Sequence, residues 1–259
     1  MPGNTCLDGQ TMISLVRDVL RELARHGVRR VVLVNGHYEN SMFLTEGVDL
    51  VIRELGWSGV HDFRCIILSY WDFIDEATIR AIYADDFPGW AVEHGGVLET
   101  SLMLHLHPQL VNMDLVPDHP PAKFPPYDHF PVKPELTPAS GCLSSAKRAT
   151  AEYGVLQQKV AVTGNSAALG DAFYASRRIF LTPGRTLRWA VFFFMSAGER
   201  TEPIVGETHG KSDRRTDSGL DPRARDGLRA SVLRKVLGAS SSATSSSGST
   251  TLPKDFSPP

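Results

Sequence analysis

Apolar residues recur along the first part of the chain in two alternating patterns. Between Asp8 and Gly27 they return every three or four positions, which predicts a helix with Asp8 as its N-cap. The next block, RRVVLVNG at residues 29–36, is continuously apolar after its two arginines until it reaches Asn-Gly. Such a block predicts a strand that is buried on both faces, as the strands of parallel sheets are.

The two patterns then repeat. Asn40 or Ser41 can cap a second helix, and DFRCIILSYW at residues 62–71 predicts a second strand. Helical spacing predicts three further helices: residues 75–83, Gly96 to Pro108, and a cap at Ser144 or Ser145 continuing to about Tyr174. The alternation of helices with buried strands indicates an α/β fold, layered as α/β/α around a mostly parallel sheet.

Composition divides the chain into three parts. Residues 1–176 carry the helix and strand patterns and form one predicted domain, whereas residues 177–198 are an extension without an assigned structure. Residues 199–259 are charged and turn-rich and contain the low-complexity run SSSATSSSGST, so we expect them to be mostly disordered. Within the first part, residues 117–138 contain eight prolines, and a long loop of this kind is often functional.

Charge and cysteine content narrow the choice of partners and compartment. The formal net charge of −2 gives no reason to expect nucleic acid or an anionic membrane as a partner. The densest apolar run, WAVFFFM at residues 189–195, is far shorter than the roughly 20 residues of a membrane span. The cysteines Cys6, Cys65 and Cys142 are sparse and odd in number, which favours reduced thiols and a cytoplasmic protein.

Two polar clusters follow predicted strands or turns and are candidates for chemistry. His37 and Glu39 stand two residues apart directly after the first predicted strand, where ligands usually bind in α/β folds. Imidazole and carboxylate are ligands of zinc and manganese, so the pair is a candidate metal site. The alternative is an exposed His and Glu at the start of a helix, since His-x-Glu occurs often by chance.

The second cluster is GWAVEHGGVLETS at residues 89–101. Glu93 beside His94 can orient the imidazole or shift its pKa for proton transfer, and the two following glycines allow a ligand close to the backbone. A solvated pair in a glycine-rich turn is the alternative. Glu99 can cap the following helix through its charge, or it can act as a ligand or support one. The chain contains no G-x-S-x-G sequence for a serine nucleophile.

Tryptophans accompany both clusters. Trp71 and Trp90 each end or begin a polar stretch close to the same predicted pocket. Tryptophan most often packs in cores, but two such rings can also enclose a flat or cationic ligand.

Four segments together resemble one known family. They are LVNGHYENSMF at 33–43, LSYWDF at 68–73, GWAVEHGGVLETSLML at 89–104 and DHPPAKFPPYDHFPV at 118–132. These segments are similar to those of creatininases, the creatinine amidohydrolases, and the resemblance extends from about Pro2 to Phe173. Tyr and Glu after His37 match the creatininase form of the first segment, where the wider family usually has two glycines.

The resemblance implies a metal-dependent cyclic amidohydrolase that converts creatinine and water to creatine. It implies a binuclear site for zinc, manganese or both, with His37 and Glu39 among the metal ligands. It also implies a homohexamer as the assembled enzyme.

The resemblance further implies roles around the substrate. By match, Tyr38, Trp90 and His94 would contact creatinine, and His94 would also carry a proton. Trp71 would act as a gate over the pocket, and Glu93 would stand beside His94.

Two departures from the family affect these expectations. Ala91 stands where creatininases have an acidic residue that binds the substrate. The family's further metal ligands, a Glu-x-His pair on its first strand and a bridging Asp, belong upstream of the segment that matches the start of this chain. We therefore expect a chain truncated at its N-terminus relative to the family, with the first strand or strands missing and a sheet edge unpaired. The C-terminal tail resembles nothing in the family.

Three functional hypotheses follow. The first is a creatininase-type hydrolase, with the activity of this chain undecided because part of the metal site is absent. The second is a catalytically inactive truncated remnant that binds a partner or one metal ion. The third, motivated by Ala91, is a related metal-dependent amidase with a different cyclic amide as substrate.

Overall fold

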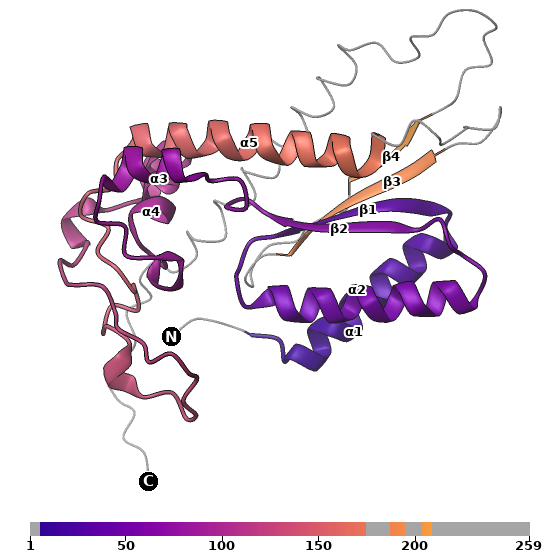
Figure 1. Cartoon of the computed structure of the whole chain (residues 1–259), viewed down its shortest axis with the longest axis horizontal. Helices are drawn as coiled ribbons and strands as arrows, with labels where there is room; N and C mark the ends of the chain where they lie inside the picture. The colour runs from indigo at the N-terminus through magenta and orange to yellow at the C-terminus, as the bar shows by residue number, and fades with distance from the viewer. Residues whose placement is uncertain (1–5, 175–186, 195–203, 209–259) are drawn as a thin grey trace, which may run out of the picture.

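The computed structural model describes residues 6–174, 187–194 and 204–208. Its sheet has four strands in the order β2-β1-β3-β4 (Figure 1). The strands are β1 (Val28–Asn35), β2 (Arg64–Ser69), β3 (Leu187–Phe194) and β4 (Ile204–Thr208). β1 pairs in parallel with β2 and β3, and β3 pairs antiparallel with β4. The prediction of a mostly parallel sheet is confirmed.

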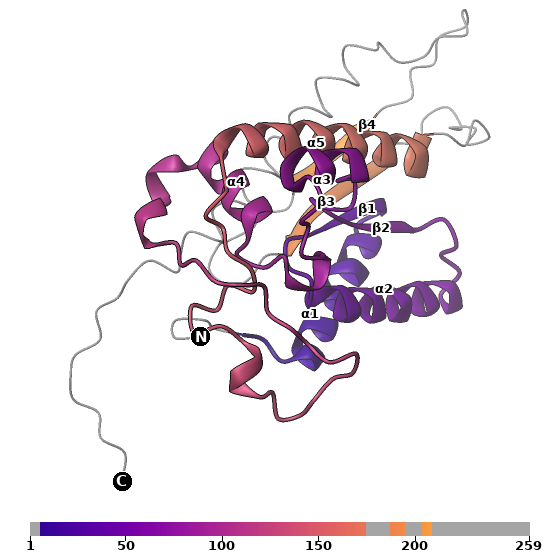
Figure 2. The same cartoon turned by 60° about the vertical axis from the view of Figure 1, so that its left-hand side comes forward.

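Helices cover both faces of the sheet. α1 (Gly9–Arg25) and α2 (Asn40–Trp57) pack together on one face, while α5 (Ala151–Tyr174) lies across the other (Figure 1). The shorter helices α3 (Glu76–Tyr83) and α4 (Val97–Leu106) pack against α5 beside the sheet, as Figure 2 shows from a second side. Four short 3-10 turns lie in the connections: η1 (Trp90–Val92), η2 (Pro108–Leu110), η3 (Met113–Leu115) and η4 (Pro134–Leu136). This is the layered α/β/α arrangement that the sequence predicts.

Two apolar clusters among the described residues hold the layers together. In the first, Val31 and Leu33 of β1 are fully buried against Leu20 of α1 and Val51 of α2. A strand flanked by sheet neighbours and covered by helices has no solvent face, which explains its continuous apolar sequence. The second cluster joins α3, α4 and α5 and includes Leu98 at the start of α4. None of the helices that the structure describes combines the length and the apolar character needed to span a lipid bilayer.

The last helix begins later than the sequence pattern predicts. It starts at Ala151, whereas the Ser144 hydroxyl donates to Glu93 and the Ser145 hydroxyl donates to the Pro117 carbonyl. Thr150 takes the capping position instead, and its Oγ1 accepts a hydrogen bond from the Tyr153 N–H at 3.3 Å. The predicted cap at either serine is therefore wrong by about five residues.

β3 and β4 come from the part of the chain that the sequence pattern leaves without predicted elements. β3 lies within residues 177–198, and β4 lies within residues 199–259, which were expected to be mostly disordered. The rest of that expectation, residues 209–259 above all, lies outside the described residues. Because β3 pairs with β1 on the side opposite to β2, β1 forms backbone hydrogen bonds with a neighbouring strand on each side. In the described part of the chain, the outer edges of the sheet belong to β2 and β4.

Candidate active site

Asn35 ends β1 and fixes the turn that follows it. Its side chain is fully buried, and its Nδ2 donates to the Ser41 hydroxyl at 3.0 Å. Its Oδ1 accepts from the backbone N–H of His37 at 3.2 Å. A buried amide needs partners on both sides, and here it gains them by bonding the turn and the start of α2. His37 is thereby held at the carboxyl end of β1.

His37 and Glu39 pair with each other. His37 Nδ1 lies 2.7 Å from Glu39 Oε2, and the side chains are 37% and 69% exposed. The side chains of the two candidate metal ligands therefore converge, as expected for residues two apart after a strand. Both side chains are accessible to solvent.

A glycine pair shapes the turn that carries His94. Gly95 has φ +64, and a Cβ at that position would also lie 2.7 Å from Sγ of Cys142. A Cβ on Gly96 would lie 2.5 Å from both the Glu93 carboxylate and the Ser144 hydroxyl. Only glycine allows this backbone course without displacing neighbours. The glycines therefore serve the packing of the turn, and the close approach of a ligand expected there stays a prediction.

The Glu93 carboxylate is directed to three donors around the start of α4. Its Oε2 accepts from the Tyr83 hydroxyl at 2.5 Å and the Ser144 hydroxyl at 3.4 Å, and its Oε1 accepts from the Leu98 N–H at 2.6 Å. Burial raises the pKa of Glu93 above its usual value, and the hydrogen bonds partly oppose this shift. These contacts differ from the expected pairing of Glu93 with its sequence neighbour His94.

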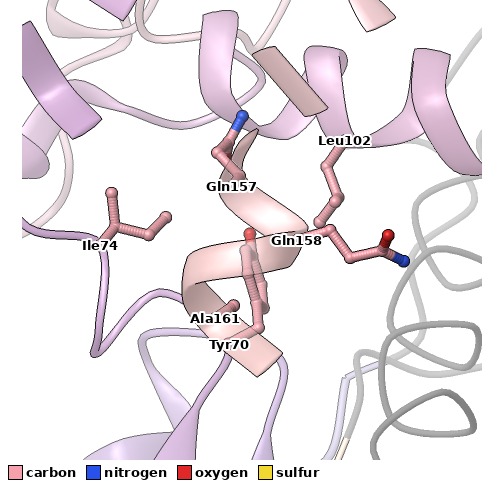
Figure 3. Close-up of a pocket in the computed structure, with 6 residues that line it drawn as sticks. All are labelled: Tyr70, Ile74, Leu102, Gln157, Gln158 and Ala161. Atoms are coloured by element: carbon pink, nitrogen blue, oxygen red, sulfur yellow. The ribbon is translucent and has the colours of Figure 1, made fainter. Parts of the chain in front are cut away.

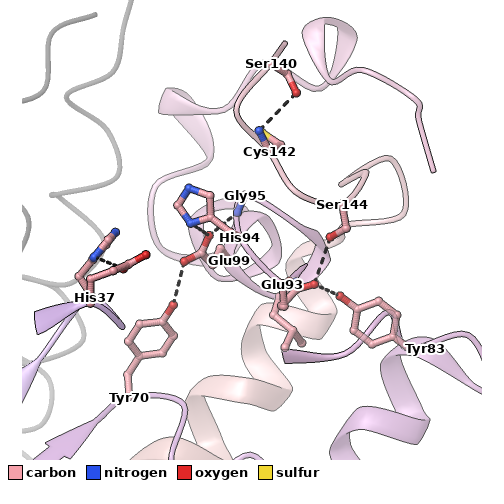
Figure 4. Close-up of polar contacts among 12 residues, drawn as sticks. His37, Tyr70, Tyr83, Glu93, His94, Gly95, Glu99, Ser140, Cys142 and Ser144 are labelled. Atoms are coloured by element: carbon pink, nitrogen blue, oxygen red, sulfur yellow. Dashed lines mark hydrogen bonds and ion pairs between the residues drawn. The ribbon is translucent and has the colours of Figure 1, made fainter. Parts of the chain in front are cut away.

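The imidazole rings of His37 and His94, one from each cluster, lie close together. The ring centroids of His37 and His94 lie 6.2 Å apart in an edge-to-face arrangement. The two residues come from the end of β1 and from the turn before α4, and both rings are partly exposed. Figure 4 shows both rings, with His37 at the end of its strand. The structure thus brings together the two clusters that the sequence singled out.

Tyr70 and Glu99 complete the cluster, and sequence reasoning gave Tyr70 no role. The Tyr70 hydroxyl at the end of β2 donates to Glu99 Oε1 at 3.4 Å (Figure 4). Burial, followed by the nearby Glu99 charge, raises the pKa of Tyr70 well above its usual value, so its hydroxyl stays protonated. The signal for Tyr70 was its place immediately after a buried strand. Asn35 carried the same signal at the end of β1.

Each candidate tryptophan packs against an aromatic neighbour. Trp71 packs edge-on against Tyr70, with ring centroids 4.7 Å apart, and Trp90 packs against Phe87 at 5.5 Å. Trp90 and Tyr38 are 48% and 77% exposed, so both have free surface for a ligand. Each tryptophan is fixed by its own aromatic neighbour.

A small hollow lies beneath the cluster, between the end of β2 and helices α4 and α5 (Figure 3). The hollow is too narrow to admit even a water molecule, so it offers no room for a ligand. Its lining consists of Tyr70, Ile74, Leu102, Gln157, Gln158 and Ala161. The buried Gln157 amide donates to the Leu98 carbonyl at 3.2 Å and so ties α5 to α4. We regard this hollow as part of the packing that supports the site.

Comparison with known proteins identifies the family. A family model described as Creatininase: Creatinine amidohydrolase matches residues 1–169. The chain belongs to the creatininase family. A creatinine amidohydrolase of Pseudomonas putida is 58% identical over 173 residues, which are 66% of this chain and 66% of that creatininase. The chain thus spans about two thirds of the length of this relative.

Solved creatininase structures share the fold. A mutant creatininase described as Zn-Zn type is 57% identical, with a TM-score of 0.65, over 67% of this chain and 68% of that chain. A structure described as Creatininase Mn is 58% identical with the same TM-score and the same coverage. A mutant creatininase complexed with creatine is 57% identical, with a TM-score of 0.64, over 66% of this chain and 68% of that chain. The layered α/β fold predicted from the sequence is confirmed as a creatininase fold.

The residues of this chain can be tested against such metal ions. His37 and Glu39 have the right donor types, an imidazole nitrogen and a carboxylate. Across the part of the chain that the structure describes, however, no three His, Cys, Asp or Glu side chains are grouped to hold a metal ion. A catalytic zinc normally has three protein ligands. The described residues therefore fit zinc or manganese in donor type but not in number.

Proposed function

We propose that this chain is a creatininase-type amidohydrolase that opens the ring of creatinine to give creatine. The observation that carries this proposal is the meeting of His37 and His94, 6.2 Å apart, at the carboxyl end of the parallel sheet. The two residues belong to separate segments of the region that matches the creatininase family model. Creatine is also the molecule bound in one of the similar creatininase structures.

Ring opening places defined demands on the side chains. The oxygen of water bonds to the ring carbonyl carbon, the carbon–nitrogen bond breaks, and the leaving nitrogen takes up a proton. We assign the movement of that proton to His94, whose partly exposed imidazole has one nitrogen that can accept a proton and one that can donate it. Tyr38, Trp71 and Trp90 would contact the planar substrate through their rings.

The contacts of Glu93 support a different role from that of a proton carrier. Its three hydrogen bonds connect Tyr83, the start of α4 and Ser144, so it braces the turn that presents His94. We therefore propose Glu93 as a structural carboxylate of the site. We propose Zn²⁺ or Mn²⁺ as the metal, with His37 and Glu39 as the two ligands that the described residues offer, because similar creatininase structures are of the Zn-Zn and Mn forms.

A second candidate function is binding of creatinine or a single metal ion without turnover. Two observations favour it: His37 and Glu39 are paired with each other, and the described residues contribute no third donor to them. This candidate retains the family fold and the substrate contacts but lacks the chemical step.

One experiment separates the two candidates. The purified full chain is incubated with creatinine and either Zn²⁺ or Mn²⁺, creatine formation is followed, and creatinine binding is measured by calorimetry in parallel. The hydrolase proposal expects creatine formation that the His94→Asn substitution abolishes. If calorimetry detects creatinine binding but no creatine forms, the binding function is supported in place of the hydrolase. If the chain neither binds creatinine nor forms creatine, both candidates are rejected.

The compartment and the assembly are also proposals. Cys6, Cys65 and Cys142 are all free thiols, which supports the reducing, cytoplasmic setting expected from the sequence. We propose a homo-oligomer, as expected from the family resemblance, and light scattering of the full chain tests it through the molar mass.

A further inference from the structure

Glu99 faces His94 from the first turn of α4. Its Oε2 lies 4.0 Å from Nδ1 of His94, and its side chain is 28% exposed. Among the ion pairs recorded for the described residues, this is the one that involves His94. The carboxylate next to His94 in the sequence, Glu93, has both oxygens engaged by other donors. The carboxylate that faces the imidazole is therefore not the one the sequence suggested.

Two donors fix the Glu99 carboxylate in this position. Its Oε2 accepts from the Gly95 N–H at 2.5 Å, and its Oε1 accepts from the Tyr70 hydroxyl at 3.4 Å. Figure 4 shows Glu99 between Tyr70 and His94. A helix cap needs only the first of these contacts, since a glutamate in the first turn commonly bonds back to the backbone ahead of the helix. The Tyr70 contact adds a link from α4 to the end of β2.

Tyr70 is itself held in place. Its ring packs edge-on against Trp71, with ring centroids 4.7 Å apart, and its side chain is half-buried. The chain of contacts thus runs from β2 through Tyr70 and Glu99 to the turn that carries His94. Groups whose own side chains are locked by packing and hydrogen bonds hold a reacting group in the productive geometry.

We propose that Glu99 is the positioning residue of His94. The carboxylate faces the imidazole on its Nδ1 side at 4.0 Å, and this arrangement orients Nε2 toward the substrate. This inference rests on the proposed function, in which His94 moves the proton during ring opening. Glu99 itself touches neither the substrate nor the transferred proton.

The test uses three variants of the full chain. Glu99→Gln keeps the size of the side chain and removes its charge, and Tyr70→Phe removes one anchor of the carboxylate without altering the cap of α4. Asp75→Asn is the matched control, because Asp75 caps α3 by accepting from the Thr78 N–H at 2.8 Å and lies outside the cluster. A misplaced catalytic group costs up to about a hundredfold in rate. We expect Glu99→Gln to lower kcat roughly tenfold to hundredfold, with KM changed less than about twofold.

The control separates positioning from capping. Asp75→Asn is expected to lower the midpoint of thermal unfolding while kcat stays at the wild-type value. Tyr70→Phe is expected to lower kcat in the same direction as Glu99→Gln, and it decides the question if Glu99→Gln does not fold. Equal losses of kcat in Asp75→Asn and Glu99→Gln, or wild-type kcat in both Glu99→Gln and Tyr70→Phe, would overturn the proposal.

A second readout does not depend on turnover. The NMR signal of the His94 Cε1–H group in the wild-type chain is expected to be single and sharp, because the ring has one position. It should shift and broaden in Glu99→Gln and Tyr70→Phe but not in Asp75→Asn. If the wild-type chain forms no creatine, the proposed hydrolase function fails while this signal still decides the role of Glu99. An unchanged His94 signal in both Glu99→Gln and Tyr70→Phe would refute the positioning role of Glu99.

Discussion

At the scale of a single residue, the burial and hydrogen bonding of Glu93 make the stability of the fold depend on pH. Three donors hold its carboxylate, yet burial outweighs them and raises its pKa above the ordinary value of 4.5. A raised pKa means that the folded chain binds this proton more tightly than the unfolded chain does. The stability that the group contributes is therefore complete below pH 4.5 and is lost as pH rises through the folded pKa.

Glu93→Gln should remove this pH dependence. Glutamine stays neutral, its carbonyl can accept from the Leu98 N–H, and the other titrating groups are unchanged. Thermal unfolding from about pH 4 to about pH 8 should show the wild type losing stability relative to the variant as pH rises. If the difference between the two midpoints stays constant across this range, Glu93 does not titrate as the structure implies.

Ala91 is the residue at which the sequence resemblance implies a departure from the creatininase pattern next to the substrate. It is exposed on η1, one residue after Trp90, so a longer side chain has room there. Ala91→Asp should lower KM for creatinine about tenfold, since a hydrogen bond to a charged group contributes about 1.5–3 kcal/mol. Ala91→Asn, which has the same shape without the charge, is the control. Equal KM values for the Asp and Asn variants would count against a lost carboxylate partner.

At the scale of elements, the contact between α4 and α5 depends on a glycine. A Cβ on Gly154 would come closer than 3.0 Å to the Ser101 carbonyl and to Cβ of His105. Gly56 near the end of α2 is the opposite case, because a Cβ there would meet nothing within 4 Å. The two positions have the same intrinsic helix preference and differ in packing.

Alanine substitutions at these two glycines should therefore have opposite effects. Gly154→Ala should destabilise the fold by about 1–3 kcal/mol through overpacking, whereas Gly56→Ala should stabilise it by roughly 0.5–1 kcal/mol through helix propensity. Urea unfolding of both variants measures the difference. A Gly154→Ala variant as stable as the wild type would show that α4 and α5 can separate without cost.

Sequence periodicity predicted the elements whose determinants are local. α1, β1 and α2 follow from apolar spacing and nearby capping residues, and their bounds lie close to the predicted ones. β3 was not predicted although WAVFFFM at residues 189–195 is strongly apolar, because its pairing with β1 across more than 150 residues of sequence leaves no local pattern. The start of α5 was misplaced because several residues in that stretch can cap a helix, and Thr150 is the one that does so.

At the scale of the whole molecule, parallel topology explains why separate sequence clusters converge. β1 and β2 end at the same edge of the sheet, so residues that follow each strand are brought together there. This rule pointed to His37, and the carboxylate beside an imidazole in the second cluster pointed to His94. It could not show which carboxylate faces His94, because that depends on the backbone of Gly95 and on contacts from Tyr70 and α4.

Creatine formation from creatinine is the measurement that tests the central claim most directly. The purified full chain, supplied with Zn²⁺ or Mn²⁺, should form creatine at a rate proportional to its concentration. His94→Asn and His37→Ala should each reduce that rate by at least about a hundredfold while the fold remains intact. An absence of creatine formation by the wild-type chain with both ions, or an undiminished rate in His94→Asn, would contradict the account.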